Sequence, residues 1–300
     1  MTRRGRVSAL LALCCTVAGV VLAGCDEASD AGPAVPSGVS APGPEAFTGV
    51  KKIQVDGKSV NVSCSGTQVA GKPVVVLVAG AGDGLKTFES LQQTLSAKNR
   101  VCSYDRLGEG DSAQPDGPQS FDSTGKVLTG VLDQVAGGAP IVLAGHSLGG
   151  LIVGRYAPGH QDRVKGLVLM DATSPAQAAD LEKDIPASAG GAAAELRDQT
   201  LAVLRGDSPE KLATPDGPVA SAGSIPAEVI QHGNTYLVDS VPEYGQALEK
   251  SWSDGQQKWL GLSSRANLSI ATTSGHYIYR DQPDLAVRAI ERVTSEAVPA

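Results

Sequence analysis

Apolar residues fall into two kinds of pattern that alternate along this chain from about residue 50 onward. Short, nearly continuous apolar runs are typical of strands buried on both faces, whereas apolar residues spaced three or four apart are typical of helices with one buried face. The runs predict strands at 74–79, 100–104, 141–144, 164–170 and 268–272, with a weaker one at 227–231. The helical spacing predicts helices at 87–97, 121–135, 241–260 and 283–293. Strands that alternate with helices predict an α/β fold, with a mostly parallel twisted sheet and helices on both faces.

The start of this region follows a different pattern, with an apolar residue at every second position. Ile53 and Val55 precede the turn-forming pair Asp56-Gly57, and Val60 and Val62 follow it. Alternation on both sides of an Asp-Gly pair is typical of a two-residue β-hairpin. We therefore expect a hairpin ahead of the first buried strand.

Residues 174–224 carry no signal of a buried strand. Leu181, Leu196, Leu201 and Leu204 are spread through a stretch that is otherwise rich in Ala, Gly and Pro. Long connections of this kind in a compact domain are commonly lids over a binding site. We expect a mobile helical cap over the carboxyl ends of the strands.

The first 24 residues have the pattern of a signal peptide that is removed on export. Basic residues precede an apolar stretch at 7–22, and Leu22-Ala-Gly-Cys25 ends it. This ending resembles the lipobox of bacterial lipoproteins, in which the cysteine carries the lipid and becomes the mature N-terminus. We therefore expect a lipidated Cys25 and a protein anchored to the outer face of the cell membrane. The alternatives are cleavage without lipidation and a retained membrane helix, for which the apolar stretch is short.

Residues 25–48 are rich in Pro, Gly, Ser and Ala, and they connect Cys25 to the rest of the chain. Almost no bulky apolar side chain is available there to offset the entropy of ordering, so a disordered tether is expected. Residues 49–300 have the size of one α/β domain with an insertion, and we expect a monomer. The net charge of −7 argues against nucleic acid as a partner, and only 3 Phe and 2 Trp are present, which predicts an aliphatic core.

One stretch combines a strand, a tight turn and a helix with a side chain that can act as a nucleophile. The apolar run at 141–144 continues as Gly145-His-Ser-Leu-Gly149, and a helical pattern follows. This arrangement is typical of a nucleophile elbow, with Ser147 at the apex on a strained backbone. Gly145 and Gly149 are needed because a Cβ at either position would collide across the turn. The alternative is an ordinary serine in a glycine-rich turn.

Four motifs, in this order along the chain, resemble those of the α/β-hydrolase fold serine hydrolases of the esterase and lipase type. They are an apolar strand that runs into a glycine loop at 76–82, a turn at 104–112, the elbow at 145–149 and a Gly-His turn at 274–278. The resemblance extends from about residue 50 to the C-terminus and implies that fold. It also implies that the turn at 104–112 is structural, so no chemistry is assigned to Asp105 or Arg106.

The same resemblance assigns roles to individual residues. Ser147 is the expected nucleophile and His276 the expected base. The backbone N–H groups of Ala81 and Leu148 are expected to hold the oxyanion. Ala79 stands where many members of the family have His, so a side-chain contact is lost there while the backbone donors remain.

Histidine is scarce in this sequence, with four residues, and the base can therefore also be sought by elimination. A serine hydroxyl is a weak nucleophile until an imidazole takes its proton. His276 follows an apolar strand at a glycine turn, where catalytic groups of α/β proteins gather. For His146, His160 and His232 a surface or packing role is expected instead.

Two carboxylates are candidates for the acid that would orient His276. Most members of the family place it after the strand that corresponds here to 227–231, and the first carboxylate after that strand is Asp239. Asp171 instead directly follows the strand at 164–170, in a turn that resembles the one from which pancreatic-type lipases draw their acid. We favour Asp171, while Asp239, or neither residue, stays open.

The usual strand order of this fold also implies a disulfide. Of the 5 cysteines, only Cys64 and Cys102 lie within the domain, and the fold makes their strands neighbours. Export would permit the bond to form. The alternative is a pair of buried free thiols.

Together these features predict a serine hydrolase that cleaves carboxylic esters through an acyl-enzyme intermediate, with a small-molecule ester or acyl compound as its substrate. The sequence shows no metal-ligand spacing and no dinucleotide-binding glycine pattern, so no metal or cofactor is expected. An amidase or aminopeptidase on the same scaffold is the first alternative, because the cap selects the substrate. A lipid-tethered ligand-binding protein without turnover is the second.

Overall fold

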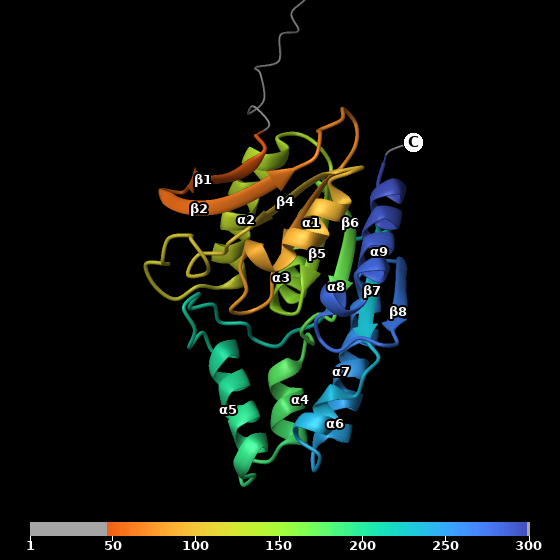
Figure 1. The fold of residues 1–300 in the computed structure, drawn as a ribbon. Helices are drawn as coiled ribbons and strands as arrows, with labels where there is room; N and C mark the ends of the chain where they lie inside the picture. The colour runs from red at the N-terminus through yellow and green to blue at the C-terminus, as the bar shows by residue number, and fades with distance from the viewer. Residues whose placement is uncertain (1–46, 299–300) are drawn as a thin grey trace, which may run out of the picture. The chain divides into compact units, whose positions relative to one another are not determined.

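An eight-stranded sheet underlies the fold (Figure 1). The computed structural model describes residues 47–298, so the predicted signal peptide, Cys25 and the tether up to residue 46 lie outside the described residues. The strand order is β1-β2-β4-β3-β5-β6-β7-β8, in which β2 is antiparallel to both of its neighbours and all other pairs are parallel. The strands are β1 (Gly49–Val55), β2 (Lys58–Ser65), β3 (Val74–Val78), β4 (Arg100–Tyr104), β5 (Ile141–His146), β6 (Val164–Met170), β7 (Pro226–His232) and β8 (Arg265–Ala271).

Helices cover both faces of this sheet, and the central strand β3 is apolar at every position. Along β3, Val74, Val76 and Val78 pack into one hydrophobic cluster, and Val75 and Leu77 pack into another on the opposite face. The first cluster includes side chains of α2 (Phe121–Ala136) and α3 (Leu148–Tyr156), and the second includes those of α1 (Glu89–Leu95) and α9 (Pro283–Glu296). The predicted α/β architecture is therefore confirmed.

The predicted hairpin is present at the edge of the sheet. Asp56 and Gly57 form its turn with φ of 47° and 76°, and Val55 pairs with Lys58 on either side of them. Two consecutive residues with positive φ match the right-handed twist of the flanking strands, and Asp-Gly tolerates this conformation well.

A disulfide joins the hairpin to the next strand of the sheet. Cys64 on β2 and Cys102 on β4 are direct partners in the antiparallel register, and their Cα atoms are 4.1 Å apart. Both residues are buried. The predicted pairing is present in the structure, and the two cysteines are not free thiols.

The cap has a hydrophobic core of its own. The connection from β6 to β7 carries α4 (Gln177–Asp184) and α5 (Gly191–Leu204), and the connection from β7 to β8 carries α6 (Tyr236–Ser240) and α7 (Gly245–Trp259). Figure 1 shows α4, α5 and α6 gathered beyond one end of the sheet. The hydrophobic cluster that joins the two connections consists of Leu181, Ile185, Ala193, Leu201, Leu204, Val241 and Leu248, the last of them on α7. Helices from both connections therefore cover the sheet end, not residues 174–224 alone.

Two predicted elements differ from the observed ones. The helix expected at 241–260 begins only at Gly245, and a separate short helix, α6, ends at Ser240. The strand expected at 268–272 begins three residues earlier, at Arg265. β8 lies at the edge of the sheet and its residues are mostly exposed or half-buried, so no continuous apolar run marks its start.

The remaining helical segments are short. They are α8 (Ile278–Asp281) and the 3₁₀ turns η1 (Leu85–Phe88), η2 (Ala157–Gly159) and η3 (Leu260–Leu262). Within residues 47–298, no helix has both the length and the apolar character needed to cross a membrane.

Candidate active site

Ser147 lies at the turn between β5 and α3, on a left-handed backbone with φ of 50° and ψ of −121°. The turn is tight: a Cβ on Gly145 would lie 2.5 Å from the carbonyl oxygen of Gly149, and a Cβ on Gly149 would lie 2.1 Å from that of Val78. Backbone atoms cannot give way as a flexible side chain can, so both positions require glycine. The elbow geometry expected from the sequence is thus present around Ser147.

Asp171 occupies a second left-handed position, directly after β6, with φ of 48°. Its side chain is fully buried, and Oδ2 accepts a hydrogen bond from Nδ1 of His276 at 2.7 Å. Oδ1 accepts from Nε1 of Trp252 at 2.8 Å and from the backbone N–H of His232 at 3.1 Å. Burial opposes ionisation, but the hydrogen bonds from His232 and His276 outweigh it and lower the pKa of Asp171 to about 2. Asp171 is therefore a carboxylate at neutral pH.

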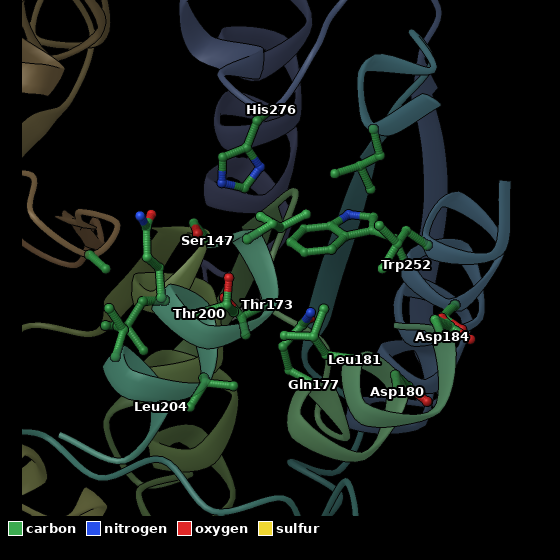
Figure 2. A pocket seen from close by; sticks show the side chains of 18 of the residues that line it. Ser147, Thr173, Gln177, Asp180, Leu181, Asp184, Thr200, Leu204, Trp252 and His276 are labelled. Atoms are coloured by element: carbon green, nitrogen blue, oxygen red, sulfur yellow. The ribbon is translucent and has the colours of Figure 1, made fainter. Parts of the chain in front are cut away.

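Ser147 and His276 line one cavity of about 400 Å³ (Figure 2). His276 comes from the segment between β8 and α8, and Figure 2 shows its imidazole on the same side of the cavity as Ser147. The structure thus brings together Ser147, Asp171 and His276, which follow or precede three different strands. The apolar lining comes mainly from the cap, namely Leu181, Leu196, Val203, Leu204, Leu237 and Leu248, and the polar lining includes Gln177, Asp180, Asp184, Gln199 and Thr200.

Ala81 and Leu148 line the same cavity beside Ser147. Leu148 is the first residue of α3, and the N–H groups of the first helical turn have no acceptor within their own helix. The amide of Leu148 also benefits from the positive end of the helix dipole. A negatively charged oxygen near Ser147 would therefore be favoured at this end of α3.

The loop that carries Ala81 is held from both sides by the 104–112 turn. Nη2 of Arg106 donates to the carbonyl oxygen of Gly80 at 2.8 Å, and Oε1 of Glu109 accepts from the N–H of Gly82 at 3.1 Å. Arg106 in turn forms a buried ion pair with Glu210 at 2.6 Å. Burial and the neighbouring Glu210 raise the pKa of Glu109 to about 7. These contacts fix the loop backbone without entering the cavity.

His146 is buried and supports the segment that carries His276. Its Nε2 lies 2.9 Å from the carbonyl oxygen of His276, so Nε2 carries the proton and donates it. Burial and the nearby His276 lower the pKa of His146 to about 3, which keeps the ring neutral. A packing role was expected for His146, and its position in the structure agrees with that expectation.

His232 was expected to have a surface or packing role, but the structure places its side chain against Asp171. Its Nδ1 lies 2.9 Å from both carboxylate oxygens of Asp171, and its Nε2 lies 2.8 Å from Oε2 of Glu249. One sequence signal was available: His232 ends a strand and is followed by Gly233, the context by which His276 was selected. Glu249 and Trp252 lie on α7, and no sequence pattern singled them out.

The other two candidates lie away from the cavity. Asp239 is exposed on α6, and only its backbone takes part in the helix. His160 stacks on the ring of Tyr156 with 3.7 Å between centroids. Of the two acids considered for His276, the structure brings Asp171 to it and leaves Asp239 at the surface.

Across 47–298, no group of three or more His, Cys, Asp or Glu residues is arranged to hold a metal ion. The carboxylates and imidazoles around Asp171 are instead paired with one another through hydrogen bonds.

Comparison with known sequences gives one family. The family model described as "alpha/beta hydrolase fold" matches residues 73–269. A protein named as a carbamate hydrolase, RutD of Azorhizobium caulinodans, is 33% identical over 102 residues, which make up 34% of this chain and 38% of that protein. The (lyso)-N-acylphosphatidylethanolamine lipase of Homo sapiens is 31% identical over 100 residues, which make up 32% of this chain and 29% of the lipase. The chain therefore spans about a third of the length of these curated relatives.

Solved structures share the fold over most of the domain. A thermophilic esterase from Thermogutta terrifontis matches with a TM-score of 0.56 at 18% identity, covering 83% of this chain and 99% of the esterase. At this identity the likeness concerns the fold alone. It confirms the predicted arrangement of a mostly parallel sheet with helices on both faces.

Proposed function

The chain belongs to the alpha/beta hydrolase fold family, and on this premise we propose that it is a serine hydrolase that cleaves carboxylic esters through an acyl-enzyme intermediate. The observation that carries the proposal is the hydrogen bond of 2.7 Å between Asp171 and Nδ1 of His276, with Ser147 in the same cavity. With Nδ1 engaged by Asp171, Nε2 is the ring nitrogen left to take a proton from Ser147.

In the first half of the proposed reaction, Oγ of Ser147 attacks the ester carbonyl carbon while Nε2 of His276 takes the hydroxyl proton. The carbonyl oxygen becomes an oxyanion, which the N–H groups of Ala81 and Leu148 stabilise. The Asp171 carboxylate stabilises the imidazolium that has formed. When the tetrahedral intermediate collapses, the bond to the alkoxide breaks, the alkoxide takes the proton from His276, and the acyl group remains on Ser147.

In the second half, water replaces the alcohol. His276 takes a proton from a water molecule, which attacks the acyl carbonyl carbon and forms a second oxyanion in the same place. Collapse then breaks the bond to Oγ, which recovers its proton from His276, and a carboxylic acid leaves. The apolar lining of Leu181, Leu204 and Leu248 suits an acyl chain.

The proposal is tested with a panel of p-nitrophenyl esters of increasing chain length, together with a serine-reactive fluorophosphonate and mass spectrometry. We expect ester turnover, labelling of Ser147, and loss of both in Ser147→Ala. The matched control is Ser240→Ala, which changes an exposed serine at the end of α6 and should retain both. Ester turnover that persists in Ser147→Ala would contradict the proposal.

A second candidate is cleavage of aminoacyl amides, and one feature of the cavity favours it. Asp180 and Asp184 line the cavity, with Lys258 3.6 Å from the first and Lys183 3.4 Å from Oδ1 of the second. Oδ2 of Asp184 is buried without a hydrogen-bond partner among residues 47–298. A carboxylate in an apolar wall attracts a cation, and the free amine of an aminoacyl substrate is one. Aminoacyl p-nitroanilides added to the panel distinguish the two: their turnover, with Ser147 labelled and every ester untouched, would replace the ester assignment.

A further inference from the structure

We propose that His232 and Glu249 are positioning residues for the reaction above: they hold Asp171 in place and moderate the negative charge that it presents to His276. This inference rests on the proposed function. It assigns no contact with substrate to either residue. It concerns only how the acid of the site is held and how its charge is balanced.

A second histidine, His232, contacts Asp171 in addition to His276. Nδ1 of His232 lies 2.9 Å from both oxygens of Asp171, and one of these oxygens, Oδ2, also accepts from His276. Nε2 of the same ring lies 2.8 Å from Oε2 of Glu249, and Oε1 of Glu249 accepts the N–H of Leu237 at 2.9 Å. Glu249, His232, Asp171 and His276 thus form one continuous line of hydrogen bonds.

The hydrogen-bond partners of His232 bear on how many protons its ring carries. A neutral imidazole carries a single N–H, so it cannot donate from both ring nitrogens. His232 has a carboxylate at each nitrogen, and its side chain is only 2% exposed. Burial alone would lower the pKa of His232, but hydrogen bonds and charges from Asp171 and Glu249 outweigh it and raise that pKa. A carboxylate at each ring nitrogen thus favours the doubly protonated imidazolium form of His232.

Side chains from several elements face His232. Asp171 approaches from the end of β6, Glu249 from α7, and Tyr236 from α6 with 4.8 Å between ring centroids. Burial and these two carboxylates raise the pKa of Tyr236, so its phenol stays neutral. Trp252 donates to the same Asp171 oxygen and carries no charge. The local charges are thus two carboxylates and one imidazolium, with His276 beyond Asp171.

The consequence concerns the protonated form of His276 that arises during the reaction. Asp171 favours that form, and a positive charge 2.9 Å behind Asp171 weakens the effect. Glu249 keeps the positive charge on His232, so removing the Glu249 charge should release the His232 proton. Asp171 would then act on His276 unscreened, and a higher pH would be needed to deprotonate His276.

The first variant is Glu249→Gln. Its amide can accept the N–H of Leu237 with the oxygen and donate to Nε2 of His232 with the nitrogen, which leaves His232 neutral and still bonded to Asp171. In the pH profile of kcat/KM, the acid limb reports protonation of His276 in the free enzyme. We expect its midpoint to move up by roughly one pH unit in Glu249→Gln.

The matched control is Glu182→Gln, which removes one carboxylate from an exposed position on α4. A loss of negative charge from the molecule as a whole would move the acid limb of both variants alike. The proposal requires the shift in Glu249→Gln alone. A limb that stays at its wild-type midpoint in a folded Glu249→Gln protein overturns it.

The second measurement is a titration of the four imidazoles by NMR in protein labelled with ¹⁵N-histidine, with the His232 signals assigned from His232→Asn. We expect the wild-type protein to lose the second ring proton of His232 at a higher pH than Glu249→Gln does. A His232 titration that is the same in both proteins overturns the proposal.

The same spectra distinguish a failure of the proposed function from a failure of the proposed roles of His232 and Glu249. They follow protonation of His276 directly, so the comparison between wild type and Glu249→Gln needs no turnover. If the protein hydrolyses no substrate but shows the His232 imidazolium and the shifted titration, the proposed function is wrong, while the proposed effect of His232 and Glu249 on Asp171 is retained. If the protein hydrolyses esters but His232 titrates alike in both proteins, only the proposed roles of His232 and Glu249 are wrong.

Discussion

The Asp171 carboxylate accepts hydrogen bonds from His276 after β8, Trp252 on α7 and His232 at the end of β7. An asparagine would present one acceptor and one donor to groups that all donate. We expect Asp171→Asn to lower kcat by roughly 10³- to 10⁴-fold, because an amide neither stabilises the His276 cation nor holds the required tautomer. Rates with a p-nitrophenyl ester and the thermal unfolding midpoint measure the effect.

The control for this prediction is the other acid considered from the sequence. Asp239→Asn changes an exposed carboxylate on α6 and should leave both kcat and the unfolding midpoint as they are. Turnover close to wild type in a folded Asp171→Asn protein would end the assignment of Asp171. A large loss in Asp239→Asn would do the same.

The difference between His276 and His232 shows how far single residues can be judged from sequence. Ser147 and His276 stand in local patterns that predict their place, namely an elbow and a Gly-His turn after a strand. The partners of His232 are Asp171, which is 61 residues earlier and directly follows the neighbouring strand β6, and Glu249 on α7. Local sequence does not contain that convergence, because it depends on β6 and β7 being neighbours and on the way α7 crosses them.

Glu109 provides a prediction about pH. Burial and the charge of Glu210 raise the pKa of Glu109 from an ordinary value of 4.5 to about 7, so between these values the folded state binds more protons than the unfolded state. Stability then falls as the pH rises from about 4.5 to 7. Glu109→Gln should remove this component, because a glutamine can still accept the N–H of Gly82. We expect its thermal midpoint to match wild type near pH 4.5 and to exceed it at pH 8.

The gain at pH 8 should be about 2 to 4 °C, which corresponds to about 1 kcal/mol once solvent screening is allowed for. Calorimetry at both pH values measures it. Glu182→Gln again serves as the control, since its exposed side chain should change neither midpoint. Equal midpoints of Glu109→Gln and wild type at pH 8 would show that Glu109 carries no raised pKa.

At the scale of elements, the sequence predicts the central strands of the sheet more accurately than the edge strand β8. β3, β5 and β6 are buried on both faces, so a largely apolar run marks each of them, with Lys165 near the start of β6 as an interruption. β8 lies at the edge with one side partly open to solvent, which explains why its first three residues escaped the apolar pattern. The cap helices are set by contacts with one another in their own cluster, and these contacts have no counterpart in local sequence.

The disulfide between β2 and β4 leads to a prediction about the stability of this side of the sheet. It closes a sequence separation of 38 residues, and in the chain-entropy model its loss costs about 3 to 4 kcal/mol of unfolding free energy. We expect Cys64→Ala combined with Cys102→Ala to lower the urea midpoint accordingly, with the fold retained. In denatured wild-type protein kept unreduced, an alkylating agent should label neither Cys64 nor Cys102, and after reduction it should label both. Two labelled thiols without reduction would contradict the bond.

At the scale of the whole molecule, residues 47–298 contain the cavity and the groups proposed for chemistry, and the preceding residues contain the proposed anchor. We propose that Cys25 is lipidated after removal of residues 1–24. The sequence between Cys25 and β1 is rich in Pro, Gly, Ser and Ala, which is typical of a linker. The two parts should therefore be separable by mutation, because anchoring and hydrolysis would depend on different residues.

Each buried CH₂ of an acyl chain contributes about 0.8 kcal/mol to membrane binding, and more than one chain is needed for a stable anchor. We expect the wild-type protein to sediment with membranes and its mature N-terminal peptide to show the mass of an acylated Cys25. Cys25→Ser should leave the membrane fraction, while kcat/KM for a water-soluble ester stays at its wild-type value, since the cavity residues are unchanged. Ser37→Ala, a substitution in the linker, is the control and should stay with the membrane. An unmodified N-terminal peptide, or a wild-type protein recovered entirely in the soluble fraction, would refute the anchor without touching the assignment of Ser147.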